Sequence, residues 1–291
     1  MARVLVIGNG FDLDLGLKTR YSDYACSSNW PFERLVTPLA RFLSEKAETE
    51  SWLDIESALA EFGTKHLGVD DKRTAERDFQ YLNESFTNYI LGVEKGPIKG
   101  ESAAVRLLEA IIEGNGDTQI LSFNFTNLAY IVRYQLFVEE PVNYLHVHGC
   151  AQKKNAILGV GDYANLNSTT DFLYKSFNRN YNPPHIIDTL LAADEVILFG
   201  LSMGRADFQY FEDYFKVLAS YEPDSKRKLT IITYDDASRI EILRNIQTMT
   251  DHNLGRIRTL NDFKILCTGE NADCWTINQL IADIKSQISQ I

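Results

Sequence analysis

Several features that would place the chain in a common class are scarce. Its 291 residues include four cysteines, and their spacing contains no Cys-x-x-Cys pair, which excludes a zinc ribbon. We expect free thiols in a reducing compartment. Long apolar runs are also missing: the stretch at the start is about five residues, too short for a signal peptide, and no later run is long enough to cross a membrane. These absences predict a cytoplasmic protein.

Basic residues are in deficit as well. The chain has 29 Lys+Arg against 40 Asp+Glu, a formal charge of -11. Such a surface repels phosphate backbones, so we do not expect direct nucleic-acid binding. With 45% hydrophobic residues and no internal repeat, low-complexity segment or linker, residues 1–291 are predicted to form a single domain.

The pattern of apolar runs predicts an α/β fold. Val4 to Ile7 is a continuous apolar run, as expected for a strand that is buried on both faces. After Gly116 short apolar runs alternate with helical patterns; we expect strands at 119–123, 142–147, 156–160, 195–199, 229–233 and 263–266. Strands that alternate with helices indicate a doubly wound, mostly parallel sheet.

A helical insertion is predicted after the first strand. Residues from about 21 to 115 are rich in Leu, Ala, Glu and Lys at helical spacing, and helices are expected at 32–45, 52–65, 73–91 and 103–113. This insertion is either a lid or assembly surface above a ligand site, or a set of helices that only covers the core.

The first candidate site is the glycine turn that follows strand one, Gly8-Asn9-Gly10-Phe11-Asp12. Glycines allow the backbone to approach a pyrophosphate, and the start of the next helix favours negative charge. A tight strand-to-helix turn would use the same residues, and the full Gly-x-Gly-x-x-Gly is absent because residue 13 is Leu. Asp12 would contact a ribose hydroxyl, cap a helix or order the loop.

Two further candidates also follow predicted strands. Asn124, in Ser122-Phe123-Asn124-Phe125-Thr126, could orient a water or a ribose hydroxyl, or cap the next helix. In His146-Val147-His148-Gly149 the alternation puts both histidines on one face, but no third ligand completes a metal site. His148, next to a glycine, is the better candidate for general acid–base chemistry, and His146 fits an interior histidine.

The last candidate is Gly200-Leu201-Ser202-Met203-Gly204-Arg205-Ala206-Asp207, after another apolar strand. Its Gly-x-Ser-x-Gly spacing matches the nucleophile elbow of serine hydrolases, but only His252 follows it as a catalytic partner. The alternative is that Gly200 and Ser202 hold part of a nucleotide while Asp207 caps the next helix. In a parallel sheet these strand ends would converge on one cleft.

These motifs together resemble a known family. Residues 6–24, together with the segments 52–56, 122–126, 148–149 and 200–207, look in their order like the bacterial AbiH abortive infection proteins. That family is similar in turn to the sirtuin-like superfamily, which has a Rossmann-like domain that binds NAD. The resemblance implies that Gly8 and Gly10 line the first glycine loop, Asn124 lies near the nicotinamide ribose, His148 is catalytic, and Gly200 and Ser202 lie near the adenosine half.

The resemblance therefore implies an NAD-cleaving effector of phage defence that needs no metal. Two departures matter: the four-cysteine zinc module of sirtuin deacetylases is missing, and Thr126 replaces the aspartate that often follows the Asn motif. The hypothesis is hydrolysis of the bond between nicotinamide and ribose, with NAD as substrate and with His148 and Asn124 catalytic. An off state, relieved by a protein partner, a nucleotide signal or oligomerisation, is expected. The alternatives are a sensor of NAD or ADP-ribose, a serine hydrolase on Ser202, and an interaction subunit of a defence complex.

Overall fold

The computed structural model describes residues 2–32, 36–49, 54–114, 118–138, 143–220, 226–269 and 271–286. Its strands are β1 (Arg3–Ile7), β2 (Thr118–Ser122), β3 (Tyr144–His146), β4 (Glu195–Phe199), β5 (Lys228–Thr233) and β6 (Asp262–Cys267). Its α-helices are α1 (Asn9–Asp14), α2 (Tyr21–Ala25), α3 (Pro38–Thr49), α4 (Ile55–Gly63), α5 (Val69–Val93), α6 (Ala103–Glu113), α7 (Leu128–Gln135), α8 (Ile187–Ala192), α9 (Phe208–Ser220), α10 (Asp236–Met249), α11 (Leu254–Leu260) and α12 (Asn271–Ser286). The short 3₁₀ helices are η1 (Asp171–Leu173), η2 (Lys175–Phe177) and η3 (Arg205–Asp207). In the described part of the chain no helix is both long and apolar enough to cross a membrane.

The strands form one parallel sheet in the order β3-β2-β1-β4-β5-β6. β1 and β4, the central pair, are buried along their whole length, which explains their uninterrupted apolar sequences. The chain winds outward in one direction from β1 and in the other direction from β4. This order confirms the predicted doubly wound, Rossmann-like fold, and it puts the topological switch point between β1 and β4.

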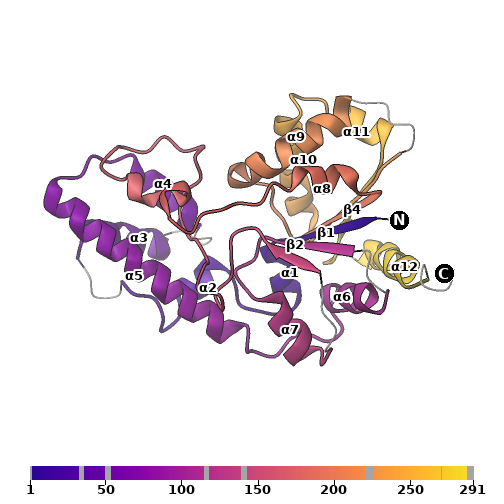
Figure 1. The fold of residues 1–291 in the computed structure, drawn as a ribbon, viewed down its shortest axis with the longest axis horizontal. Helices are drawn as coiled ribbons and strands as arrows, with labels where there is room; N and C mark the ends of the chain where they lie inside the picture. Colours follow the sequence, from indigo (N-terminus) through magenta and orange to yellow (C-terminus); the bar gives the residue numbers. More distant parts are fainter. Residues whose placement is uncertain are drawn as a thin grey trace.

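Two helical layers cover the sheet because successive strand residues point to opposite faces. Leu5 and Ile7 of β1 pack in a cluster with α1, α6, α7 and α12, whereas Val4 and Val6 pack in a second cluster with α8, α9, α10 and α11. Figure 1 shows α6 and α12 side by side at one end of the molecule, and α8, α9, α10 and α11 on the other side of the strands.

A separate helical part lies to one side of the sheet, where α3, α4 and α5 are drawn in Figure 1. It has its own core, in which α2, α3, α4 and α5 pack on buried side chains from the later segment 151–173. The predicted insertion of residues 21–115 is thus reflected in α2–α5, whereas α6 packs on the sheet. The strand predicted at 156–160 is wrong: these residues form a single bridge, from Val160 to Tyr174, inside the helical part.

The turns after β1 and β4 touch each other through their backbones. Gly10 N–H donates to Gly200 C=O at 2.8 Å, and Gly8 N–H donates to Phe199 C=O at 2.9 Å. A Cβ atom on Gly10 would lie 2.6 Å from the Cα of Gly200, closer than real Cβ contacts come. Gly200 itself has φ +70°, in the left-handed region that favours glycine. Glycines are therefore needed at these positions for the backbone contact between the two turns.

Replacing Gly200 with alanine should lower the free energy of unfolding by about 2–4 kcal/mol, because the new Cβ meets the backbone of Phe11 and the left-handed φ is strained. Gly255→Ala is the matched control, since nothing lies within 4 Å of its added Cβ and the residue is in a helix. We expect that control to change stability by less than about 1 kcal/mol, in the stabilising direction. Urea unfolding of the variants measures both effects, and equal stabilities would contradict the role of the contact.

Candidate functional site

The candidate residues come together at one edge of the sheet. Ile7 at the end of β1 is in register with Ser122 of β2 and Phe199 of β4, and Ser122 is in register with His146 of β3. The turns that follow these four strands are therefore neighbours at the carboxyl edge, where open α/β sheets bind their ligands.

The glycine turn is engaged mainly in packing. Besides the contact between Gly10 and Gly200, the Asn9 side-chain oxygen accepts a hydrogen bond from Thr19 Oγ1 at 2.5 Å. Phe11 is fully buried, and its ring meets that of Phe199 edge-on with centroids 5.2 Å apart. The ring of Phe11 is therefore closed to a ligand at this turn, whereas the exposed side chain of Asn9 is accessible.

Asp12 and Asn124 form a buried polar cluster with Thr126. Asn124 Nδ2 and Thr126 Oγ1 each donate to the Asp12 carboxylate at 2.8 Å. Burial raises the pKa of Asp12 to about 7, because Asp12 is only 2% exposed and its two hydrogen bonds offset only part of the loss of water. With its amide nitrogen bound to Asp12, Asn124 offers its amide oxygen to a ligand.

His146 lies behind this cluster as an interior histidine. Its Nδ1 is 3.3 Å from the backbone oxygen of Asn124, and burial lowers its pKa to about 4. Its Nε2 is buried with no hydrogen-bond partner among the described residues. His146 is therefore neutral at physiological pH and supports the chain at Asn124.

His148 is buried among aromatic rings. The centroid of its ring lies 5.4 Å from that of Phe123, 5.6 Å from that of Tyr210 and 6.5 Å from that of Phe125. Burial holds the pKa of His148 well below its usual value, and the positive charge of Lys175 lowers it further. The imidazole is therefore neutral at pH 7 and its orientation is fixed by its neighbours.

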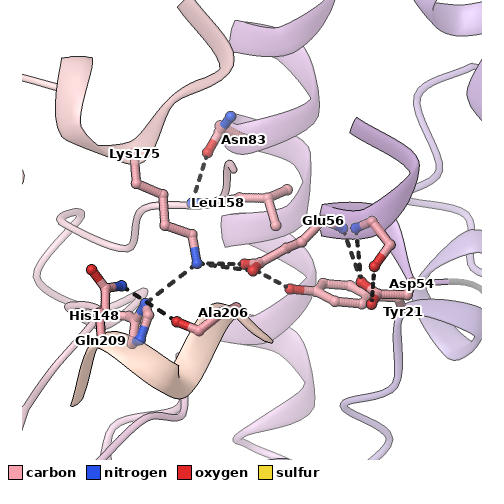
Figure 2. Close-up of polar contacts among 10 residues, drawn as sticks. Tyr21, Asp54, Glu56, Asn83, His148, Leu158, Lys175, Ala206 and Gln209 are labelled. Atoms are coloured by element: carbon pink, nitrogen blue, oxygen red, sulfur yellow. Dashed lines mark hydrogen bonds and ion pairs between the residues drawn. The ribbon is translucent and has the colours of Figure 1, made fainter. Parts of the chain in front are cut away.

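A chain of polar contacts leads from His148 into the helical part (Figure 2). Lys175 Nζ lies 3.5 Å from His148 Nδ1 and 2.8 Å and 2.9 Å from the two oxygens of Glu56. Tyr21 donates its hydroxyl to the same carboxylate at 3.3 Å. Burial raises the pKa of Glu56, and the neighbouring Lys175 opposes that shift.

Local structure fixes each member of this chain. The carboxylate of Asp54 caps α4 by accepting from the backbone N–H of Glu56 at 3.0 Å, which sets the first turn of that helix. Lys175 begins η2 and is held by a backbone bond to Val160 at 2.8 Å. The site thus combines residues of the sheet with residues of the helical part.

The loop after β4 adds the carboxylate of Asp207 to the site. Asp207 ends η3, and burial raises its pKa to about 7, with Lys175 lowering it and the carboxylates of Glu56 and Asp54 adding to the increase. The charges of Lys175 and Glu56 thus both act on Asp207. Ser202 is exposed, and among the described residues its hydroxyl has no hydrogen bond to a histidine; Asn245 instead donates to its backbone oxygen at 3.0 Å.

Sequence reasoning did not single out Lys175 or Tyr21, although Tyr21 lies within residues 6–24, which resemble the family. Lys175 lies in a polar, aromatic segment with no recognisable motif, and only the three-dimensional fold brings it to His148. Glu56 had a signal, since it ends the segment 52–56 that resembles the family, although residues 52 and 53 lie outside the described residues. No group of three or more His, Cys, Asp or Glu side chains in the described residues is arranged to hold a metal ion.

Comparison with known proteins places this architecture in a family. A family model described as bacteriophage abortive infection AbiH matches residues 4–225, more than half of the chain. The match covers β1, β2, β3 and β4, the helical part, and every residue of the polar chain from His148 to Tyr21. No curated protein matches the chain. The chain therefore belongs to the AbiH family of bacteriophage abortive infection proteins, which implies a role in defence against phage.

Proposed function

We propose that this protein is an NAD-hydrolysing effector of phage defence, which releases nicotinamide and is inactive until it is triggered. The observation that carries the proposal is the strand order 3-2-1-4-5-6, because dinucleotides bind across the crevice where such an order reverses. His148 and Asn124 lie at the same edge of the sheet as that switch point. Their resemblance to the catalytic positions of sirtuin-like proteins supports NAD as the ligand.

The proposed reaction consumes one water molecule. The bond between the ribose C1′ and the nicotinamide nitrogen breaks, nicotinamide leaves with the bonding electrons, and water adds to C1′ and loses one proton. NAD and water thus give ADP-ribose, nicotinamide and a proton. Because the sugar resembles an oxocarbenium ion at the transition state, positioning and electrostatics contribute more than nucleophilic strength.

Residues of this site suit such a transition state. The free amide oxygen of Asn124 accepts a hydrogen bond from the attacking water or a ribose hydroxyl, and the neutral imidazole of His148 binds at the same ribose. When ionised, the carboxylate of Asp207 stabilises the positive charge that develops on the sugar. The backbone of the turns at Gly8–Asp12 and Gly200–Ser202 is the proposed wall on the phosphate side.

An enzyme that destroys NAD needs an off state in its own host. Lys175, Glu56 and Tyr21 come from the helical part, whereas His148 and Asp207 come from the sheet. A protein partner or oligomerisation that moves one part relative to the other would therefore assemble or disrupt the site. This assigns the helical part the role of the regulatory lid.

His148→Ala and Asn124→Ala should each lower NAD consumption by about 10²-fold or more, because each removes a group that is positioned at the ribose. The assay is mass spectrometry of NAD, nicotinamide and ADP-ribose in phage-challenged bacteria that carry the full chain. His185→Ala, on an exposed histidine that pairs with the nearby Asp188, is the matched control and should behave as wild type.

Two outcomes of that assay would contradict the proposal. Cells that are protected from phage while NAD stays constant would show that defence does not use NAD hydrolysis. Purified wild-type protein that retains intact NAD in the presence of its trigger would instead support a sensor of the nucleotide.

The rate of nicotinamide release should rise with pH up to about 7 and then level off. The pKa of Asp207 is raised to about 7, so its carboxyl is protonated below this pH and carries the useful negative charge only above it. His148 stays neutral over this range because its pKa is lowered, so it adds no second transition. Asp12, whose pKa is also raised to about 7, titrates in the same range, so Asp207→Asn should be slower above pH 7 and should keep only the pH dependence that Asp12 contributes. An unchanged profile in that variant would contradict the role of Asp207.

A further inference from the structure

In the contact between Lys175 and His148, the ammonium must be the hydrogen-bond donor and the ring nitrogen the acceptor. A lysine ammonium carries three hydrogen-bond donors and no acceptor. Because Lys175 Nζ lies 3.5 Å from His148 Nδ1, the ring nitrogen must present its lone pair to the ammonium. A neutral imidazole has one N–H, so the hydrogen of His148 resides on Nε2.

Lys175 is held too firmly to leave Nδ1 free. Its side chain is 4% exposed, and both oxygens of Glu56 accept from its ammonium within 3 Å. Separating this buried pair would leave an uncompensated charge in the site, which is strongly unfavourable. Tyr21 donates to Oε1 of Glu56, one of the two oxygens that accept from the ammonium, and so helps to hold the carboxylate in place.

The ring of His148 is fixed as well. Phe123 and Tyr210 pack on it from the sheet side, and Phe125 adds a third aromatic contact. Phe123 is in turn stacked on Phe211 with centroids 5.4 Å apart, so the aromatic group has a rigid base. These contacts fix the position of Nε2, and Lys175 determines that Nε2 carries the hydrogen of the neutral ring.

We propose that His148 acts as a hydrogen-bond donor through Nε2–H, and that Lys175, anchored by Glu56, is the positioning residue that fixes this tautomer. This inference rests on the proposed NAD hydrolysis and specifies the role of His148 in it. The acceptor is an oxygen of the ligand, a ribose hydroxyl in the proposed reaction. A general base at Nε2 would instead need its hydrogen on Nδ1, where it would face the ammonium hydrogens of Lys175.

The tautomer can be measured without any activity. In protein labelled with ¹⁵N-histidine, nitrogen–carbon-bound proton correlation spectra separate the two tautomers, and His148→Gln assigns the signal of His148 among the five histidines. We expect a neutral ring with the hydrogen on Nε2. A hydrogen on Nδ1, or a doubly protonated ring at pH 7, would overturn the inference.

The double variant Lys175→Met with Glu56→Gln tests the positioning role, because it removes both charges and leaves no unpaired ion in the buried site. His148 should then lose its single tautomer and show a mixture of the two. A spectrum with Nε2–H unchanged would show that Lys175 does not set the tautomer.

Three substitutions of His148 separate a donor from a base. Gln places an amide N–H near the position of Nε2, Asn places one near Nδ1, and Ala places none. We expect His148→Gln to keep NAD turnover within about 10-fold of wild type, as for the exchange of one hydrogen bond. His148→Asn and His148→Ala should lose about 10²- to 10³-fold.

A His148→Gln variant as inactive as His148→Ala would overturn the donor role and favour a base. Wild-type protein that does not cleave NAD at all would overturn the proposed function instead. The Nε2–H tautomer would still stand in that case, and titration calorimetry of the three variants with ADP-ribose would test the donor, with His148→Gln expected to bind more tightly than His148→Ala. Equal binding by these two variants would overturn the donor role.

Discussion

The buried ammonium of Lys175 joins the two parts of this molecule. A charge at 4% exposure is tolerated only where it is paired, so the segment that carries Lys175 must meet Glu56 on α4. Both residues belong to the helical part, but the ammonium also reaches His148, which follows β3 of the sheet. The ion pair therefore holds the ammonium in place within the helical part, and the contact with His148 connects that part to the carboxyl edge of the sheet.

A second constraint acts at the centre of the sheet. The backbones after β1 and β4 come into direct contact at Gly10 and Gly200, so the switch point has no room for side chains. The next polar groups along this edge are Asp12 with Asn124, and then His148. Rigid backbone at the switch point and buried polar groups beside it give a prearranged edge, which is what positional catalysis requires.

The sheet could be predicted from the sequence because its signals are local. Continuous apolar runs in β1 and β4, each followed by a glycine, predict strands buried on both faces, and the structure confirms them. The strand predicted at 156–160 shows where such local signals are insufficient. This apolar run forms a loop because it packs on the core of the helical part and does not join the sheet. α11 was not expected, since it is short and contains Gly255.

The part of the site that includes Lys175 could not be predicted, for a different reason. Asn124 and His148 follow strands, so a local rule places them at one edge, but Lys175 reaches His148 only because residues 151–177 fold onto α2–α5, which come much earlier in the chain. Lys175 and Glu56 are separated by 119 positions in the sequence, so no local pattern predicts their contact. A site assembled from such distant segments exists only in the complete fold. If the protein hydrolyses NAD as proposed, such an assembly suits an enzyme that would kill its own host. A small displacement of the helical part would move the Lys175 ammonium away from His148 Nδ1 and leave the fold of the sheet intact.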